Sequence, residues 1–374
     1  MRREAETLAS LPEYNVTVLT LKEGGAAPSY DVDGVRLIEL NEKKYDGKNK
    51  VRYVLSYIKF LVLSLFTCTK LFLSGKVDIV HVHNMPNFLV FAGIVPWLFG
   101  KKLILDIHDS VPETYLAKFN TSSALLFRIL CLEESISCSF AHKIISVNHV
   151  QHDVLVKRGI PSEKIIISMN VPDPKRFDRD NIRNARGKED HSFKMIYHGT
   201  IAKRLGVDLA IEAVALLKNK ILNLEFHVWG KSGDDFYDFI RLSEELAVSD
   251  KVCFINGGVP LDRLPLELTR MDLGVIGNKK GIATELMLPV KMLEYIALGI
   301  PVVAPRLKCI EYYFSDEMVC YFDPEDVDSM ASAIFKLYKD ESLRKKQAEK
   351  AKAFLNQYGW EKHKMDLINL YKNI

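Results

Sequence analysis

Cysteine is scarce in this chain, and the few cysteines present form no motif. The six residues are spread over 374 positions without a Cys-x-x-Cys pair. Thiols distributed in this way are typical of reduced, mostly buried side chains in a cytosolic protein. The closest histidine pairs, His81/His83 and His149/His152, have no cysteine or further histidine beside them. The sequence therefore predicts no metal site.

A strong charge imbalance is also missing. The 51 lysines and arginines nearly balance the 48 aspartates and glutamates, which leaves a net charge of +3. Binding of nucleic acid by phosphate neutralisation needs a concentrated basic face, so we expect no nucleic-acid partner. We also expect no secretory leader, because the first residues, Met-Arg-Arg-Glu-Ala-Glu, carry acids and no apolar segment. The expected localisation is the cytoplasm.

Long hydrophobic runs are rare, and the main one covers residues 51–74. About 20 such residues could span a bilayer as a helix. Lys59 and Lys70 interrupt the run, and a lysine inside the bilayer is costly. We interpret the segment as a long core helix. Peripheral contact of one of its faces with the inner side of a membrane is the open alternative.

Along the chain, short β-branched runs alternate with longer helical patterns, which indicates α/β domains with parallel sheets. At this length two domains are expected. Residues 2–11 read as a helix, so the usual first strand and its glycine-rich turn are missing from the pattern. In the first half, strands are predicted at 15–19, 35–40, 78–83, 102–107, 142–147 and 164–169. Helices are predicted between them at 51–74, 87–99, 123–140 and 150–157.

A stretch rich in Asp, Arg, Lys and Asn at 172–192 interrupts this alternation and reads as a linker. The alternation then restarts, with strands predicted at 193–198, 224–229, 252–255, 273–276, 301–304 and 318–322. The helices predicted in this half are 206–218, 235–246, 291–298 and 327–339. The tail, 341–371, reads as one or two further helices.

The first motif that could carry chemistry runs from Tyr197 to Gly206, where a strand ends and a helix should begin. Glycines allow a tight backbone path, and free N–H groups at a helix start attract an anion. Lys203 and Arg204 could add charge-assisted contacts to a diphosphate. A plain strand–helix turn with a solvated cation pair explains the same residues equally well.

The second motif covers residues 288–304, where a helix follows Pro289 and ends at Gly299 before a short buried strand. Glu294 lies near the start of this helix. Its carboxylate could accept hydrogen bonds from two ribose hydroxyls, or it could simply offset the helix dipole.

Taken together, these segments resemble the donor-binding half of family 4 glycosyltransferases of the bacterial polysaccharide-biosynthesis type. Asp-Ile-Val-His-Val-His at 78–83 and Leu-Asp-Ile-His-Asp at 105–109 resemble the family's first-domain strands. Asn-Val-Pro-Asp at 170–173 with Phe177 resembles its interdomain signature. Tyr-Gly-Trp at 358–360 is similar to its C-terminal crossover. The resemblance covers nearly the whole chain.

The resemblance implies a GT-B fold, with two Rossmann-like doubly wound domains facing a cleft. It implies an acceptor-side domain at 1–170, a linker at 171–192, a nucleotide-sugar domain at 193–355 and a returning helix at 356–374. It also implies transfer of sugar, with retention, from a UDP- or GDP-sugar donor to a glycan or lipid-linked acceptor. No metal or cofactor is implied.

Site residues follow from the same resemblance. Catalytic roles fall on His108, Arg204 and Glu294, with His108 reaching the donor sugar and Glu294 binding the ribose. The backbone amides of Met287 and Leu288 should face the phosphate or sugar. The other donor-binding residues expected are Gly199, Thr200, Lys203, Gly206, Glu285, Leu288, Pro289 and Lys291.

This chain departs from the family pattern at several points. The first glutamate of the family's E-x7-E motif falls on Leu286, one position after Glu285. Thr200 replaces the usual phosphate-loop arginine. Three alternatives stay open: a non-catalytic scaffold, a nucleotide-sugar epimerase using Asp106, Asp109 and Glu113, and a metal-dependent transferase using one of three Asp-x-Asp triplets.

Overall fold

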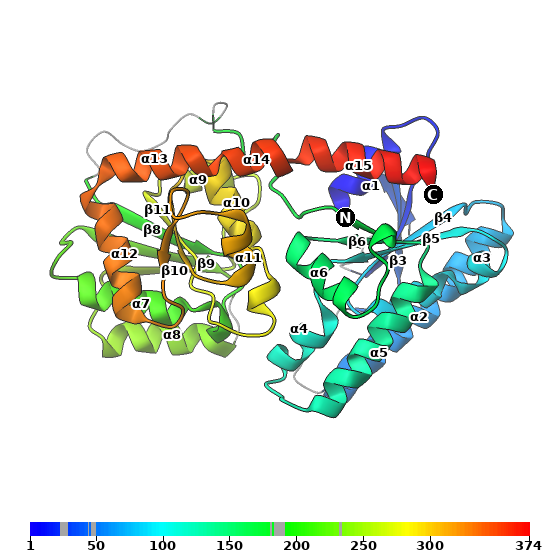
Figure 1. Cartoon of the computed structure of the whole chain (residues 1–374), viewed down its shortest axis with the longest axis horizontal. Helices are drawn as coiled ribbons and strands as arrows, with labels where there is room; N and C mark the ends of the chain where they lie inside the picture. Colours follow the sequence, from blue (N-terminus) through cyan, green and yellow to red (C-terminus); the bar gives the residue numbers. More distant parts are fainter. Residues whose placement is uncertain (23–28, 44, 46–49, 180–181, 183–190, 232–233) are drawn as a thin grey trace. The chain divides into compact units, whose positions relative to one another are not determined.

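The computed structural model describes residues 1–22, 29–43, 45, 50–179, 182, 191–231 and 234–374. The chain forms two compact units. Unit 1 comprises Met1–Met169 together with Glu361–Ile374, and unit 2 comprises Asn170–Trp360. Both are α/β units built on parallel strands, as the sequence predicts (Figure 1). Of the segment expected to be a linker, residues 180–181 and 183–190 lie outside the described residues.

Unit 1 contains two sheets. In the first, of order β1-β3-β2, β1 and β3 are parallel and β2 is antiparallel; in the second, of order β4-β5-β6-β7, all strands are parallel. The strands are β1 (Thr17–Leu21), β2 (Ser29–Val32), β3 (Val35–Leu40), β4 (Ile79–His83), β5 (Lys102–Ile107), β6 (Lys143–Ser146) and β7 (Ile165–Ile167).

The helices of unit 1 are α1 (Arg2–Ala9), α2 (Lys50–Leu73), η1 (Asn87–Gly93), α3 (Ile94–Leu98), α4 (Val111–Lys118), α5 (Ala124–Phe140), α6 (His149–Lys157), η2 (Ser162–Lys164) and α15 (Trp360–Asn373). The chain thus opens with a helix, as predicted. Leu367 and Leu370 of α15 share a hydrophobic cluster with Leu8 of α1 and with Ile104 and Ile145 of the sheet. The last helix therefore belongs to unit 1.

The predicted long helix at 51–74 forms as α2, but the prediction that it lies in the core is wrong. Only 11% of its most apolar stretch, within Val51–Leu73, is buried. The hydrophobic pattern specifies a helix, whereas burial depends on what packs over it.

Unit 2 contains one six-stranded sheet, all parallel, of order β10-β9-β8-β11-β12-β13. Its strands are β8 (Phe193–His198), β9 (Leu224–Gly230), β10 (Val252–Asn256), β11 (Leu273–Val275), β12 (Val302–Pro305) and β13 (Cys320–Phe322). This is the doubly wound dinucleotide-binding order, in which the direction of winding reverses between β8 and β11. Ligands in such sheets bind outside the carboxyl ends of the strands at that reversal.

The helices of unit 2 are η3 (Lys203–Leu205), α7 (Val207–Leu217), α8 (Asp234–Glu245), α9 (Leu264–Leu268), η4 (Thr284–Leu286), α10 (Val290–Ala297), α11 (Lys308–Tyr313), α12 (Val327–Lys339), α13 (Glu341–Ala351) and α14 (Ala353–Tyr358). Helices α7 and α12 run side by side (Figure 1). Their apolar faces, including Ala210, Val214 and Ile334, pack with Met195 of β8 into one core.

Candidate functional site

The two loops at the reversal point of the unit 2 sheet meet through glycines. Gly206 follows the loop after β8, and Gly277 follows β11. A Cβ at Gly206 would lie 1.8 Å from the Gly277 carbonyl oxygen, and φ of Gly206 is +68°. Only glycine tolerates both conditions. Gly206, predicted as a site residue, thus joins the two loops, while Gly277 was missed although it follows a predicted strand.

Gly199 shapes the start of the loop after β8. Its φ is +104°, a conformation that other residues rarely adopt. Its N–H donates to the Trp229 carbonyl (2.8 Å), so it is not one of the free amides expected for an anion. The carbonyl of Thr200 accepts from the Tyr197 hydroxyl (2.5 Å), which holds the next residue of the loop.

Lys291 lies on the first turn of α10 and points back toward this loop. Its Nζ is 3.6 Å from the centre of the Tyr197 ring, and a Cβ on Gly199 would lie 3.7 Å from it. The ammonium is buried and has no hydrogen-bond partner among the described residues. Burial lowers the pKa of Lys291 to about 7, and the charge of Arg204 acts in the same direction. The Glu294 carboxylate acts in the opposite direction and raises this pKa. The loop therefore encloses an uncompensated cation.

Glu294 lies one turn further along α10, and its carboxylate is held by a histidine. His198 Nε2 donates to Glu294 Oε2 (2.7 Å), and His198 Nδ1 lies 2.9 Å from the Tyr295 hydroxyl. The Tyr295 ring packs against Gly274, where a Cβ would approach it to 2.3 Å. His198 and Tyr295, which sequence reasoning missed, fix the orientation of Glu294.

Two predicted cations behave differently. Lys203 is exposed and forms an ion pair with Asp238 of α8 (3.1 Å), so its charge is already compensated. Arg204 is exposed, and no described residue forms a hydrogen bond or ion pair with its guanidinium. Arg204 is therefore the better-placed of the two to meet an anion.

The segment before α10 corrects one expectation. The N–H of Met287 donates to the Thr284 carbonyl (3.3 Å) and is not available to a phosphate. Glu285 accepts from the N–H of Lys308 (2.6 Å), at the first residue of α11, so one of its oxygens holds another element of unit 2. Leu288 is half-buried, and Pro289 is the residue before α10.

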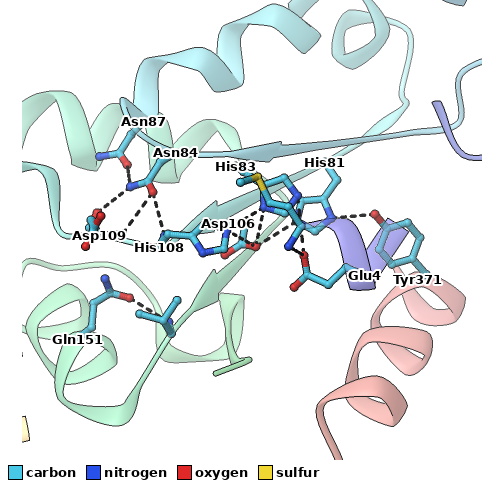
Figure 2. A network of polar contacts seen from close by, with 12 residues as sticks. Glu4, His81, His83, Asn84, Asn87, Asp106, His108, Asp109, Gln151 and Tyr371 are labelled. Atoms are coloured by element: carbon cyan, nitrogen blue, oxygen red, sulfur yellow. Dashed lines mark hydrogen bonds and ion pairs between the residues drawn. The ribbon is translucent and has the colours of Figure 1, made fainter. Parts of the chain in front are cut away.

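His108, the remaining predicted catalytic residue, belongs to unit 1 and to a buried polar cluster there (Figure 2). Asp106 Oδ2 lies 2.9 Å from His83 Nδ1, 3.2 Å from His108 Nε2 and 3.7 Å from His81 Nε2. His81 and His83 come from β4 and Asp106 from the neighbouring β5, where His83 and Asp106 are register partners. Tyr371 of α15 binds His81 Nδ1 (2.8 Å).

The cluster separates the proton affinities of its histidines. Burial favours the neutral form of Asp106, but the close contacts of its carboxylate with the three histidines hold its pKa well below the ordinary value. Burial also lowers the pKa of His83. For His108 burial acts in the same direction, but the Asp106 carboxylate outweighs it and raises the pKa. His108 therefore favours the charged form more than His83 does.

Among the described residues, one set of three side chains could in principle hold a metal ion. His81, His83 and Asp106 offer ligand atoms within 4.8 Å of one another. These atoms already contact one another as an ion-pair cluster. Of the Asp-x-Asp triplets, Asp326 caps α12 by accepting from the N–H of Ser329 (2.8 Å), and Asp180 lies outside the described residues.

Two of the three carboxylates of the epimerase alternative already have partners within unit 1. Glu113 is buried and binds Arg158, which also binds Glu134 (2.6 Å). Asp106 instead belongs to the histidine cluster. This arrangement gives Glu113 a structural ion pair rather than a role as acid or base.

Two family profiles together match almost the whole chain. Glycosyltransferase Family 4 matches residues 2–176, and Glycosyl transferases group 1 matches residues 178–354.

Individual relatives are distant. The Escherichia coli protein WcaI, described as a glycosyl transferase of colanic acid biosynthesis, is 23% identical over 65% of this chain and 64% of its own length. A chitobiosyldiphosphodolichol beta-mannosyltransferase of Debaryomyces hansenii is 23% identical over 69% of this chain and 59% of its own. The matches thus span less than two thirds of either relative.

Solved structures agree on the fold. A sucrose-phosphate synthase from Thermosynechococcus elongatus superposes with a TM-score of 0.75 at 16% identity, covering 99% of this chain and 91% of that one. With the doubly wound sheet and the glycine-joined loops of unit 2, these matches establish the class: the chain belongs to the family 4 glycosyltransferases and has the GT-B fold.

Proposed function

We propose that this chain transfers a sugar, with retention and without a metal ion, from a UDP- or GDP-sugar to a glycan or lipid-linked acceptor. The donor nucleotide binds at the carboxyl ends of β8 and β11 in unit 2. Lys291 and Arg204 face the diphosphate, and Glu294 accepts hydrogen bonds from the ribose. Transfer takes place in the cytoplasm.

The observation that carries this proposal is the buried ammonium of Lys291, to which no described residue offers a hydrogen-bond partner. A buried charge without a partner destabilises a fold and is normally paired. A diphosphate at the loop after β8 would supply the missing anion. The site lies where doubly wound sheets bind ligands, and Arg204 stands close enough to lower the pKa of Lys291.

Glu294 supports the nucleotide assignment. His198 engages one carboxylate oxygen and orients the group, while the other oxygen remains to accept a ribose hydroxyl. Because Thr200 replaces the usual phosphate-loop arginine, the cation that balances the leaving diphosphate comes from α10 in this chain. Fixed cations of this kind stabilise charge that develops on a leaving group, and they need no metal to do so.

The acceptor and the stereochemistry follow from the family and its relatives. One relative is named for a dolichol-linked substrate and another for colanic acid biosynthesis, which supports a lipid-linked or growing glycan acceptor. Retention proceeds by departure of the diphosphate and attack on the same face. We assign no protein nucleophile to this step.

Calorimetric titration of UDP and of GDP into the chain, with magnesium and with a chelator, tests the proposal. We expect one nucleotide to bind equally well in both conditions. Lys291→Met and Glu294→Ala should each weaken binding by about tenfold to a hundredfold, since a hydrogen bond to a charged group contributes about 1.5–3 kcal/mol. Lys203→Met is the matched control and should leave affinity nearly unchanged.

Two results would contradict the proposal. The first is failure of the folded chain to bind either nucleotide. The second is binding that requires magnesium. The anomeric configuration of the transferred sugar, followed by NMR with a nucleotide-sugar donor, tests retention separately.

A further inference from the structure

The outer face of α2 is apolar along its whole length. Val51, Leu55, Ile58, Phe66 and Leu73 are exposed, and the Phe66 side chain is 70% exposed. Soluble proteins seldom leave a continuous apolar stripe of this length uncovered. Its inner face packs on the unit, where Tyr53, Ser64 and Cys68 are buried.

Helix α5 presents a second apolar stripe. Leu125, Ile129, Leu132 and Ile136 are all exposed, and Leu132 is 61% exposed. Their spacing of four, three and four residues places them on one side of the helix. Two helices of the same unit therefore each turn an apolar face outward.

Aromatic contacts connect the two helices at both ends. Near the C-terminal ends, Phe72 of α2 contacts Phe99 (5.3 Å between ring centres), and Trp97 of α3 contacts Phe140 of α5 (4.5 Å). Near the N-terminal ends, Tyr53 of α2 contacts Phe119, which follows α4 (5.7 Å).

Helix α4 in turn packs against α5, and both α2 and α5 pack against η1. We call the stripes of α2 and α5, together with the exposed Leu98 and Phe99, the α2–α5 face.

The exposed charges that α2 and α5 themselves carry are of one sign. Helix α2 contains no acid, and its exposed cations are Arg52, Lys59 and Lys70. The exposed charged residue of α5 is Arg128. Its two glutamates turn inward, where Glu133 binds Ser137 (3.2 Å) and Glu134 binds Arg158. An apolar surface bordered by cations complements a bilayer with anionic headgroups.

We propose that the α2–α5 face docks on the surface of an anionic lipid bilayer, with its apolar side chains at the boundary between headgroups and acyl chains. Helix α2 is long and apolar enough to cross a membrane. It lies on the surface instead, because crossing would separate it from η1 and α3, against which it packs. Lys59, near mid-helix, is also held by Glu42 of the unit.

This proposal deepens the proposed function and rests on it only in one respect, namely that the acceptor is lipid-linked. Docking would bring the transferase to the plane in which such an acceptor lies. The bilayer contact and the donor site use different residues in different units. The two proposals can therefore fail independently.

Flotation of the full chain with lipid vesicles tests the docking. We expect binding to vesicles of phosphatidylcholine with phosphatidylglycerol, and at least tenfold weaker binding to pure phosphatidylcholine or in high salt. The double variant Phe66→Glu/Leu132→Glu should lose at least tenfold in vesicle partition. Leu222→Glu, at a side chain 77% exposed in unit 2, is the matched control and should bind like the wild type.

Three further outcomes would overturn the docking proposal. They are absence of vesicle binding, retention of the chain in vesicles after alkaline carbonate extraction, and a dimer in solution that the double variant dissociates. The second would indicate a spanning helix and the third an interface between copies. Nucleotide affinity of the double variant should equal that of the wild type, so its loss would indicate misfolding rather than lost docking.

Discussion

The ammonium of Lys291 lies 3.6 Å above the centre of the Tyr197 ring and makes no hydrogen bond within the part of the chain that the structure describes. The ring attracts the cation, but this attraction is weaker than the hydration that burial removes. Burial lowers the pKa of Lys291 to about 7, and the nearby Arg204 adds to the effect. An anion bound at this site would therefore compensate the charge of the buried ammonium.

Nucleotide affinity should depend on pH through Lys291. Above its pKa of about 7 the free protein carries a neutral Lys291, so binding must take up a proton. Affinity should fall between pH 7 and 9, by up to about tenfold per pH unit, where a phosphate with a second pKa of about 6 is already ionised. Calorimetry in buffers of different ionisation enthalpy measures both the affinity and the proton uptake.

The variant Lys291→Met isolates the contribution of Lys291 to the pH dependence. Its nucleotide affinity should be low and should not change between pH 7 and 9. Arg204→Met should move the decline to higher pH, because loss of the neighbouring charge raises the pKa of Lys291. An unchanged slope in Lys291→Met would assign the pH dependence to another group.

The buried ammonium of Lys291 should also lower the free energy of unfolding. Its folded pKa of about 7 lies below the unfolded value of about 10.4. Between these values the unfolded chain binds the extra proton, so stability rises with pH in that interval, and below pH 7 the penalty is complete. Lys291→Met should raise the free energy of unfolding by about 2 kcal/mol at pH 6 and by less at pH 9.

Denaturant unfolding at the two pH values measures this difference. Lys280→Met, at an exposed lysine of the same unit, should change stability by less than about 0.5 kcal/mol. A loss of stability in Lys291→Met at pH 6 would show that the ammonium is compensated in the folded chain.

Gly206 should tolerate no side chain. Alanine there must adopt φ near +68° and also displace the Gly277 backbone. At Gly257, with φ of +90°, a Cβ would meet nothing within 4 Å. Gly257→Ala should therefore cost about 1–2 kcal/mol from the backbone conformation alone, and Gly206→Ala clearly more. Equal losses in denaturant unfolding would mean that the two loops separate at little cost.

Sequence patterns identified most of the fold because its strands are continuous apolar runs. The strands at 35–40, 102–107 and 193–198 have the predicted bounds. Strand β2 was missed because three of its four residues are exposed and no apolar pattern marks it. Helix α11 was missed because six residues are too few for a helical period to show.

The site was less accessible to sequence reasoning. Gly199 and Glu294 stand out because each lies where a strand ends or a helix begins. The buried position of the Lys291 ammonium over the Tyr197 ring joins two distant parts of the chain, and local sequence carries no sign of it. The exposure of α2 was misjudged for a related reason, since hydrophobicity alone does not reveal which elements cover a helix.

Asp106 should control the proton affinity of His108. The carboxylate outweighs burial and raises the pKa of His108, so Asp106→Asn should drop that pKa below the ordinary value of about 6.5. The Cε1–H resonance of His108, followed by NMR titration, measures the change. Asp153→Asn, which removes a partner of His152 on α6, is the matched control and should leave His108 unaffected.

If protonated His108 assists transfer, activity is lost as pH rises through its pKa. The lower pKa in Asp106→Asn should then move this loss to lower pH by the amount seen in the NMR titration. His108→Ala should abolish this pH-dependent loss of activity while leaving nucleotide binding in unit 2 intact. A pH profile that stays in place while the His108 resonance shifts would remove His108 from the reaction and leave Asp106 and the histidines with a structural role.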